Sequence, residues 1–468
     1  NAGNSIASGG NYNVVVGDEA GTAITTGDEN TFVGYTAGDA VTTASANTGV
    51  GYAALSANTS GTQNSAFGNR AGDAITTGDG NTAIGYFSLS TTTTADNNTA
   101  VGVDSLGINS TGADNTAIGK DALRANTTAS NNTAVGSSAL VANTTGTANV
   151  AVGSLAGDAL TTGHYNTVMG HGSLSADTKG TRSVAIGMQA LAAQNFTSET
   201  SVYNTAVGFQ AGTAVTTGIE NTLIGALAGD ALTDADENTA VGLGALSADT
   251  LGSKTTAIGR GALLSQNFTT ATDTYNTAVG YFAGLAVTTG LYNTLIGGLA
   301  GDAITTGDHN VTLGVSALTS NTAANKNVAI GSNSLSVFNV TSDTDTYNTV
   351  VGYSAGGAVT TGIQNTIVGG LAGDALTDAD YNVAIGIEAL SADTLGSGST
   401  AIGRNALSTQ NFTTATTTYN TAVGDRAGLS VTTGNQNTLI GGQAGDALTD
   451  SDRNVALGYA TLSSDTLG

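Results

Sequence analysis

A five-residue phrase returns along this sequence at a fixed interval. The phrase is NTAVG or a close variant, and it recurs every 17 residues from Asn13 to Ser183. With a few longer steps it continues to Asn454, which gives twenty-six units in all. Repeats this short cannot each bury a hydrophobic face, so they gain a core only by stacking on one another. We therefore expect a single continuous all-β solenoid over residues 1–468.

Four longer units recur in register from Ser183 onward. Their steps are 21 residues instead of 17, and the anchor residues that follow them are spaced by 72 residues. These anchors are Asn204, Asn276, Asn348 and Asn420. The spacing predicts mainly 17-residue coils over residues 1–203 and 72-residue super-repeats over residues 204–468. Neither end of the chain coincides with a unit boundary, and we expect the sequence to be a fragment of a longer fibre.

Within one unit, the anchor phrase is typical of a short strand that ends at glycine. Numbering each unit from its anchor residue, place four is always Val, Ile, Leu, Met or Phe, as at Val16 and Leu457, and place five is always Gly. Side chains alternate along a strand, so places two and four share one face, and we expect that face to point to the core. A second short strand is expected after the glycine, followed by a polar turn.

Places nine and twelve vary together. Place nine is always Gly or Leu, and Gly21 goes with Ile24 whereas Leu55 goes with Asn58. In one unit both places hold a large apolar residue, Leu335 at place nine and Phe338 at place twelve. A close-packed interior tolerates neither a void nor a duplicate, so we infer that each coil holds one large plug, supplied from one place or the other.

Apolar residues also occur at place three, on the opposite face of the strand from place four. Phe32 and Leu223 are examples among many alanines. Apolar residues on both faces of a strand indicate that both faces are covered. We therefore expect lateral association of several chains, most simply a parallel homotrimer.

The composition narrows the range of partners. The chain has 35 acidic against 11 basic residues, a formal net charge of −24, and no Cys, Pro or Trp. Nucleic acids and anionic membranes require Lys and Arg to neutralise phosphate, so neither is expected as a partner. No run approaches the roughly 18 apolar residues of a membrane-spanning helix, and no membrane span is expected in these residues.

The anchor phrase resembles the repeats of two groups of fibrous proteins. At residues 183–187, 327–331 and 382–386 it matches the SVAIG-type phrase of trimeric autotransporter adhesin heads. The stretch NTAIGKDALRANTT, residues 115–128, resembles the NTAIGxxAL arrays of phage and viral tail fibres. The similarity covers nearly the whole chain, although a 17-residue unit is longer than that of the adhesin heads. It implies a left-handed parallel β-roll, a homotrimer, and an extracellular location on a cell surface or a virion fibre.

The recurrent insertion is the best candidate for contact with another molecule. Its four copies, residues 193–205, 265–277, 337–349 and 409–421, bring aromatic residues into a chain otherwise poor in them. Each copy also contains an Asn-x-Thr sequon, which matters only in a glycosylating host. The loops could form a multivalent edge for a cell-surface receptor or glycan, or a contact with a neighbouring chain, or their aromatics could fold back over the loop. The candidate binding residues are Asn195, Phe196, Tyr203, Asn267, Phe268, Tyr275, Asn339, Tyr347, Asn411, Phe412 and Tyr419.

Three acidic turns that precede anchor residues are candidate cation sites. They contain the pairs Asp234 and Asp236, Asp378 and Asp380, and Asp450 and Asp452. Alternating carboxylates resemble the opening of a Ca²⁺-binding loop, and Ca²⁺ is the one cofactor that the sequence suggests. The bidentate Glu and central Gly of an EF-hand are missing, so a plain solvated turn is the alternative.

The remaining polar residues indicate structural roles. The anchor asparagine, present in twenty-three units, is expected to form a ladder of side-chain amide hydrogen bonds. No catalytic arrangement is evident, because His164, His171 and His309 are isolated and no acid pair recurs with a general base.

These observations lead us to expect a non-enzymatic fibre segment, extracellular or virion-associated, that presents or carries a surface for attachment to a host cell. A purely structural, self-assembling filament is the alternative. An ice-binding solenoid is a more distant one, because the threonines at places thirteen and fourteen are adjacent and point to opposite sides.

Overall fold

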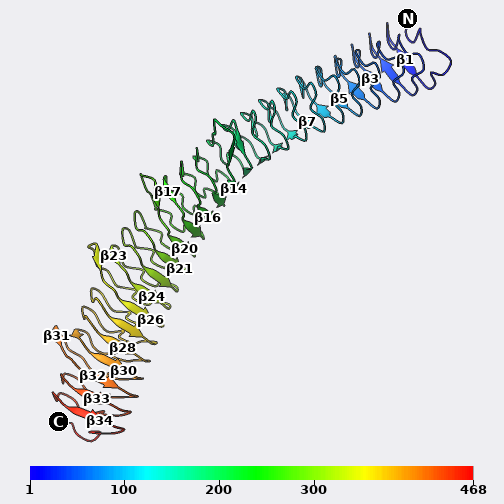
Figure 1. The fold of residues 1–468 in the computed structure, drawn as a ribbon. Coiled ribbons are helices and arrows are strands. Elements are labelled where there is room, and N and C mark those ends of the chain that lie inside the picture. The colour runs from blue at the N-terminus through cyan, green and yellow to red at the C-terminus, as the bar shows by residue number, and fades with distance from the viewer. Residues whose placement is uncertain (467–468) are drawn as a thin grey trace. The chain divides into compact units, whose positions relative to one another are not determined.

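The chain folds into parallel β-solenoid coils, as the repeat predicts. The computed structural model describes residues 1–466, and no helix occurs among them. The chain divides into two compact units, residues 1–236 and residues 237 onward. Within each unit every coil contributes one three-residue strand, and these strands follow one another in chain order (Figure 1).

The register between coils is set by the repeat itself. Each strand residue pairs in parallel with the residue at the same place of the next coil, as Val14 does with Thr31. The first unit contains β1 (Val14–Val16), β2 (Thr31–Val33), β3 (Thr48–Val50), β4 (Ser65–Phe67), β5 (Thr82–Ile84), β6 (Thr99–Val101), β7 (Thr116–Ile118), β8 (Thr133–Val135), β9 (Val150–Val152), β10 (Thr167–Met169), β12 (Val184–Ile186), β14 (Thr205–Val207) and β15 (Thr222–Ile224). The second contains β16 (Thr239–Val241), β18 (Thr256–Ile258), β20 (Thr277–Val279), β21 (Thr294–Ile296), β22 (Val311–Leu313), β24 (Val328–Ile330), β26 (Thr349–Val351), β27 (Thr366–Val368), β28 (Val383–Ile385), β30 (Thr400–Ile402), β32 (Thr421–Val423), β33 (Thr438–Ile440) and β34 (Val455–Leu457).

The strand buries its middle residue, at place three. Phe32, Ala117 and Leu223 are fully buried, whereas places two and four on the other face are partly or largely exposed. The expectation that places two and four point to the core is therefore wrong. Alternation along the strand holds, but the narrow coil takes mostly alanine from its strand, and the larger aliphatic side chain stands outside.

After the glycine of place five the chain turns, and the second strand expected there is absent from the short coils of residues 1–466. Places seven and nine are left-handed, as at Asp121 (φ 57°) and Leu123 (φ 50°). Left-handed residues at alternate positions cannot continue an extended strand. They instead direct both Ala122 and Leu123 into the core, where each is fully buried.

The exchange between places nine and twelve fills one space in the core, as predicted, whereas the coil of Leu335 and Phe338 buries both large side chains. Ile75 and Leu55 are buried in neighbouring coils, and a Cβ on Gly72 would lie 3.0 Å from Cδ1 of Ile75 and 3.1 Å from Cδ2 of Leu55. Where place nine is Leu, the amide at place twelve closes a turn instead. Asn58 accepts from the N–H of Gly61 and donates to its carbonyl, both at 2.9 Å.

The predicted ladder of anchor asparagines is present and buried. Nδ2 of Asn47 donates to the Gly61 carbonyl of its own coil at 2.9 Å, and Oδ1 of Asn30 accepts from the backbone N–H of Asn47 at 3.1 Å. One side chain thus closes its own coil and binds the next. The ladder gives a buried amide, which would be costly without partners, hydrogen bonds both within its coil and to the next one.

Each insertion is hydrogen-bonded to the coil that precedes it through a pair of two-residue strands. These pairs are β11 (Gly180–Thr181) with β13 (Thr200–Ser201), β17 (Gly252–Ser253) with β19 (Thr272–Asp273), β23 (Ala324–Asn325) with β25 (Thr344–Asp345), and β29 (Gly396–Ser397) with β31 (Thr416–Thr417). The added residues therefore form ordered edges rather than free loops.

Candidate functional site at the insertions

The four insertions, called loops 1 to 4 (residues 193–205, 265–277, 337–349 and 409–421), rest on a buried polar network. In loop 1, Nε2 of Gln194 donates to Oδ2 of Asp177 at 2.7 Å and to Oγ of Ser183 at 3.0 Å. Its Oε1 accepts from Nδ2 of Asn204 at 2.9 Å. Because Ser183 stands where most coils have the anchor asparagine, Gln194 carries the hydrogen-bond ladder across the gap.

Loops 2 and 4 repeat this network. The corresponding residues are Gln266, Asp249, Thr255 and Asn276 in loop 2, and Gln410, Asp393, Ser399 and Asn420 in loop 4. Burial raises the pKa of the Asp393 carboxyl.

Loop 3 solves the same packing problem with an apolar plug. Asn327 keeps the anchor asparagine, and Phe338 replaces the glutamine and is fully buried beside Leu335. Asn321 occupies the position of the buried aspartate, and its Nδ2 donates to the Ala324 carbonyl at 2.9 Å. The unit in which places nine and twelve are both large is therefore the one long coil that needs no bridging glutamine.

The predicted binding residues of the loops are phenylalanines, tyrosines and sequon asparagines, and the structure places the three kinds differently. Phe196, Phe268 and Phe412 are only 7–8% exposed, so their rings fold back under the loop. The tyrosines are 50–64% exposed and are the aromatics that the loops present to solvent. The sequon asparagines each accept a hydrogen bond from the preceding coil through Oδ1, and the pairs are Asn195 with Thr178, Asn267 with Thr250, Asn339 with Thr322, and Asn411 with Thr394. The exposed tyrosines are Tyr203, Tyr275, Tyr347 and Tyr419.

The exposed tyrosines belong to a longer column that sequence reasoning missed. Each is the residue immediately before an anchor, called here the pre-anchor residue, and pre-anchor residues of successive coils stack. Tyr275 stacks on Tyr292 with ring centroids 5.7 Å apart, and Tyr292 stacks on His309 at 4.7 Å. The sequence does carry a signal for this column, because aromatic residues recur at the pre-anchor place. Tyr292 and His309, however, lie in short units, whose turns are interpreted from the sequence only as connections between coils.

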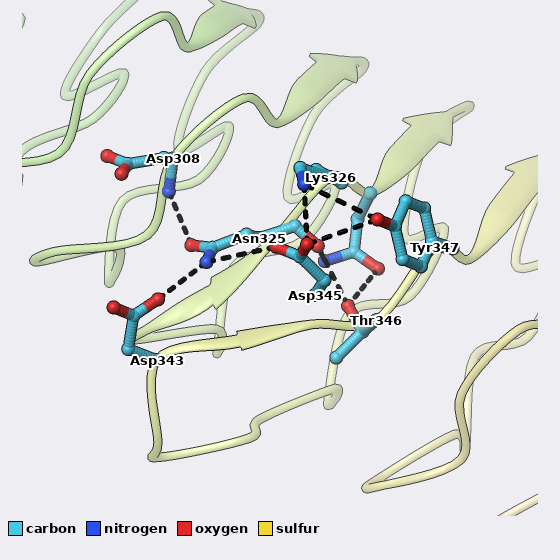
Figure 2. Close-up of polar contacts among 8 residues, drawn as sticks. Asp308, Asn325, Lys326, Asp343, Asp345, Thr346 and Tyr347 are labelled. Carbon is cyan, nitrogen blue, oxygen red and sulfur yellow. Dashed lines mark hydrogen bonds and ion pairs between the residues drawn. The ribbon is translucent and has the colours of Figure 1, made fainter.

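Cations of the same column are held by carboxylates at loops 2 and 3. Nζ of Lys326 lies 2.5 Å from Oδ2 of Asp345 and 5.3 Å from the ring centre of Tyr347, whose hydroxyl donates to the same carboxylate at 3.1 Å (Figure 2). The hydrogen bond between them raises the pKa of Lys326 and lowers that of Asp345. Loop 2 has the same triad, in which Lys254 lies 2.6 Å from Asp273 and 5.6 Å from the Tyr275 ring.

Beside the Lys326 triad, Asn325 joins two further acidic residues. Its Nδ2 donates to Oδ1 of Asp343 at 2.6 Å, and its Oδ1 accepts from the backbone N–H of Asp308 at 2.8 Å (Figure 2). The amide thus ties loop 3 to the coil before it.

The acidic turns predicted as cation sites bind the coil that precedes them. Oδ1 of Asp236 accepts from the backbone N–H of Ile219 at 2.8 Å, and Oδ1 of Asp234 accepts from the hydroxyl of Thr217 at 2.6 Å. The equivalent acceptors are Asp378, Asp380 and Asp452, while Asp450 accepts from Thr449 within its own turn. Over residues 1–466, no group of three or more Asp, Glu or His side chains is arranged to hold a metal ion. Ca²⁺ binding at these pairs stays a prediction.

A set of half-buried aspartates at place ten also escaped the sequence reasoning. In six of them one carboxylate oxygen is buried without a hydrogen-bond partner. Burial raises the pKa of five of these carboxyls, Asp39, Asp73, Asp158, Asp230 and Asp374, and the sixth residue is Asp446. Asp302, at the same place, accepts instead from the hydroxyl of Thr319.

The outer face of the strands carries a column of apolar residues, at place four, along both units. At place four, Phe67, Ile118 and Leu313 are 40–46% exposed, and at place six, just after the strand, Tyr86 and Ile387 are more than half exposed. Place two adds a column of threonine and valine, with serine at Ser65. Place six is mixed, because Lys120, Arg260, Arg404 and Asp425 also stand there. Each unit therefore presents a repeated apolar column at place four, and the face made of places two, four and six is named here the outer strand face.

No protein-family model matches this chain, and no curated protein matches it. Within the part of the chain that the structure describes, no helix has the length and apolar character needed to span a bilayer.

Proposed function

We propose that the chain is a segment of a non-enzymatic extracellular fibre, on a cell surface or a virion, that assembles side by side with copies of itself and carries surface for attachment to a host cell. The outer strand face is the observation that supports this proposal. Soluble monomers rarely expose contiguous apolar patches above a few hundred Å², and larger ones mark interaction sites.

The size and regularity of this face favour a second copy of the chain as its partner. A standard interface buries roughly 800 Å² per partner, and every coil of a unit contributes a partly or largely exposed place-four side chain toward such an area. Within a unit, equivalent place-four side chains recur once per coil. A parallel copy of the chain in register therefore places its own place-four side chains against the equivalent ones. Closed cyclic symmetry then gives a homo-oligomer, most simply a parallel trimer.

The loops give the assembled fibre a lateral attachment surface. Loops 2, 3 and 4 lie in one unit at four-coil intervals, roughly 19 Å apart for a strand spacing of about 4.8 Å. Each presents an exposed tyrosine. Copies at a regular spacing allow several weak contacts to act together on one surface.

Light scattering on the isolated chain tests the assembly. We expect the mass of about three chains, and we expect Ile118→Lys combined with Val135→Lys to give a folded monomer, because both side chains lie at place four of neighbouring coils on the outer strand face. Thr94→Lys, at an exposed turn position, is the matched control and should stay associated. A monomeric parent chain would contradict the proposal, and dissociation by a Ca²⁺ chelator would assign the association to bound metal.

A purely structural filament is the second candidate, because the same outer strand face serves it equally well. The two differ in what the loops do. If the associated chain binds no cells or glycans, and if replacing the four exposed loop tyrosines by Ser changes neither its mass nor any binding, the filament is the better description.

A further inference from the structure

The pre-anchor cation has an internal carboxylate partner at loops 2 and 3 but not at loop 1. Lys254 and Lys326 pair with the aspartates that follow them by nineteen residues, Asp273 and Asp345. At loop 1 the cation is Arg182, and the residue nineteen positions later is Ser201. Within residues 1–466, no carboxylate lies within ion-pair distance of Arg182.

The guanidinium of Arg182 is nevertheless held in place. Its central carbon lies 5.6 Å from the ring centre of Tyr165 and 5.7 Å from that of Tyr203, so the cation is placed between two aromatic rings of the pre-anchor column. Nη1 of Arg182 donates to Oγ of Ser201 at 2.5 Å and is 3.5 Å from Oγ1 of Thr181. A guanidinium has five N–H donors, and both of these contacts leave from the same nitrogen.

A hollow of about 240 Å³ opens beside Arg182. Its lining includes Tyr165, Thr200 and Ser201 together with His164 and Glu199. Nδ1 of His164 accepts from the backbone N–H of Thr147 at 2.9 Å, so a neutral imidazole carries its proton on Nε2 and can donate from there. The hollow therefore combines a positioned cation, one carboxylate, hydroxyl groups and an aromatic ring.

Loops 2 and 3 indicate which group fits next to the cation. There the position beside the ammonium and the tyrosine hydroxyl is filled by a carboxylate. At loop 1 Ser201 supplies a hydroxyl in place of the carboxylate and contacts a single nitrogen of Arg182. A carboxylate from outside can then bind the planar guanidinium through two of its other N–H groups.

The other lining groups favour a sugar over a simple anion. Glu199 repels a bare anion but accepts hydrogen bonds from neutral hydroxyls, and Thr200 and His164 can pair with hydroxyls in the same way. A volume of about 240 Å³ lies below the roughly 300–1,000 Å³ of typical ligand pockets, which suits a single sugar ring.

We propose that this hollow, the Arg182 site, binds a carboxylated sugar, such as one uronic acid residue of an acidic polysaccharide. The carboxylate pairs with Arg182, the ring packs against Tyr165, and the hydroxyls are bound by Glu199 and His164. The inference gives a ligand class to the lateral attachment proposed above and rests on that proposal for its biological meaning.

Titration of the full chain with glucuronate, followed by saturation-transfer NMR and calorimetry, tests the site. We expect one glucuronate per chain, with glucose and acetate each binding at least tenfold more weakly because they lack the carboxylate or the hydroxyls. Ser201→Asp copies the arrangement of loops 2 and 3, supplies an internal carboxylate and should weaken glucuronate binding at least tenfold while leaving the fold unchanged.

The reverse substitution gives an independent readout. Asp273→Ser leaves Lys254 without a carboxylate partner, as Arg182 is, and we expect this variant to gain a second, weaker glucuronate site. The proposal is overturned if the parent chain does not bind glucuronate, if Ser201→Asp leaves binding unchanged, or if acetate binds as well as glucuronate. Light scattering of the same samples reports self-association separately, so a chain that binds glucuronate as a monomer contradicts the fibre assembly and not the site.

Discussion

At the scale of single residues, the glycine of place five has to satisfy two conditions at once. Gly297 has φ +133°, a region that side-chain-bearing residues rarely adopt, and a Cβ there would lie 2.5 Å from the carbonyl oxygen of Gly314 in the next coil. The first condition is local and the second comes from stacking. Together they explain why this place is glycine wherever another coil follows, and Gly458, with φ +128°, meets the first condition alone.

Gly297 and its neighbour Gly298 provide a matched pair for testing this account. Gly298 has no positive φ, and nothing lies within 4 Å of its added Cβ. Gly297→Ala should cost at least about 2 kcal/mol of local stability, whereas Gly298→Ala should be neutral or stabilise by about 0.5 kcal/mol. Hydrogen exchange of the coils around residue 297, together with the thermal midpoint, measures both effects. Equal behaviour of the two variants would show that coil contact does not select the glycine.

At the scale of elements, the long coils show two ways of filling the same space. Loops 1, 2 and 4 use a glutamine that bridges a buried aspartate and a Ser or Thr anchor. Loop 3 uses Phe338 with the anchor Asn327. Either set is complete, whereas a mixture leaves a buried polar group without its partner, which is costly.

Exchanging the two sets within loop 3 tests their interdependence. Phe338→Gln alone should destabilise the protein by roughly 2–3 kcal/mol, because the new amide lacks the aspartate and the hydroxyl that hold it elsewhere. Adding Asn327→Ser and Asn321→Asp should recover most of this loss, with a coupling of about 1–3 kcal/mol. Chemical unfolding of the single, double and triple variants measures the coupling. Simple additivity would mean that the two sets are independent.

At the scale of the whole molecule, charge and burial make stability depend on pH. The formal net charge is −24, and burial raises the pKa of the place-ten carboxyls such as Asp158 and Asp230 above their unfolded value of about 3.9. A carboxyl with a raised folded-state pKa contributes stability that is complete below the unfolded pKa and is lost as pH rises through the folded-state pKa. Asp345 and Asp425 act in the opposite sense, because hydrogen-bonded ion pairs with Lys326 and Arg404 lower the pKa of these two carboxyls.

Mild acidification should therefore stabilise the chain. From pH 7 down to about 4 we expect the thermal midpoint to rise by roughly 2–5 °C, and below that range the loss of the Asp345 and Asp425 ion pairs opposes the gain. The double variant Asp158→Asn and Asp230→Asn should show a smaller rise. A midpoint that falls between pH 7 and 5 would contradict the role assigned to the place-ten carboxyls.

The repeat predicts the coil, its register, the asparagine ladder and the plug, because each of these features follows from comparing the same place in successive units. It did not predict which face of the strand is buried. Three residues are too few for a hydrophobic pattern to decide between the faces. The larger side chain, at place four, favours the wrong face, because the smaller alanine at place three is the residue that fills the core. The Arg182 site was missed because it depends on the difference between loops, Ser201 against Asp273, rather than on what they share.

The direction of the hydrogen bonds between coils also has a mechanical consequence. Backbone bonds such as that from Thr48 N–H to the Asn64 carbonyl join one coil to the next, so tension on the two ends of a unit pulls along them. Such bonds open one coil at a time instead of shearing together. Each 17-residue coil releases roughly 55–60 Å of extended chain. Under flow or load, a single unit would lengthen in small steps and absorb work at each one, with the 21-residue coils giving the longest steps.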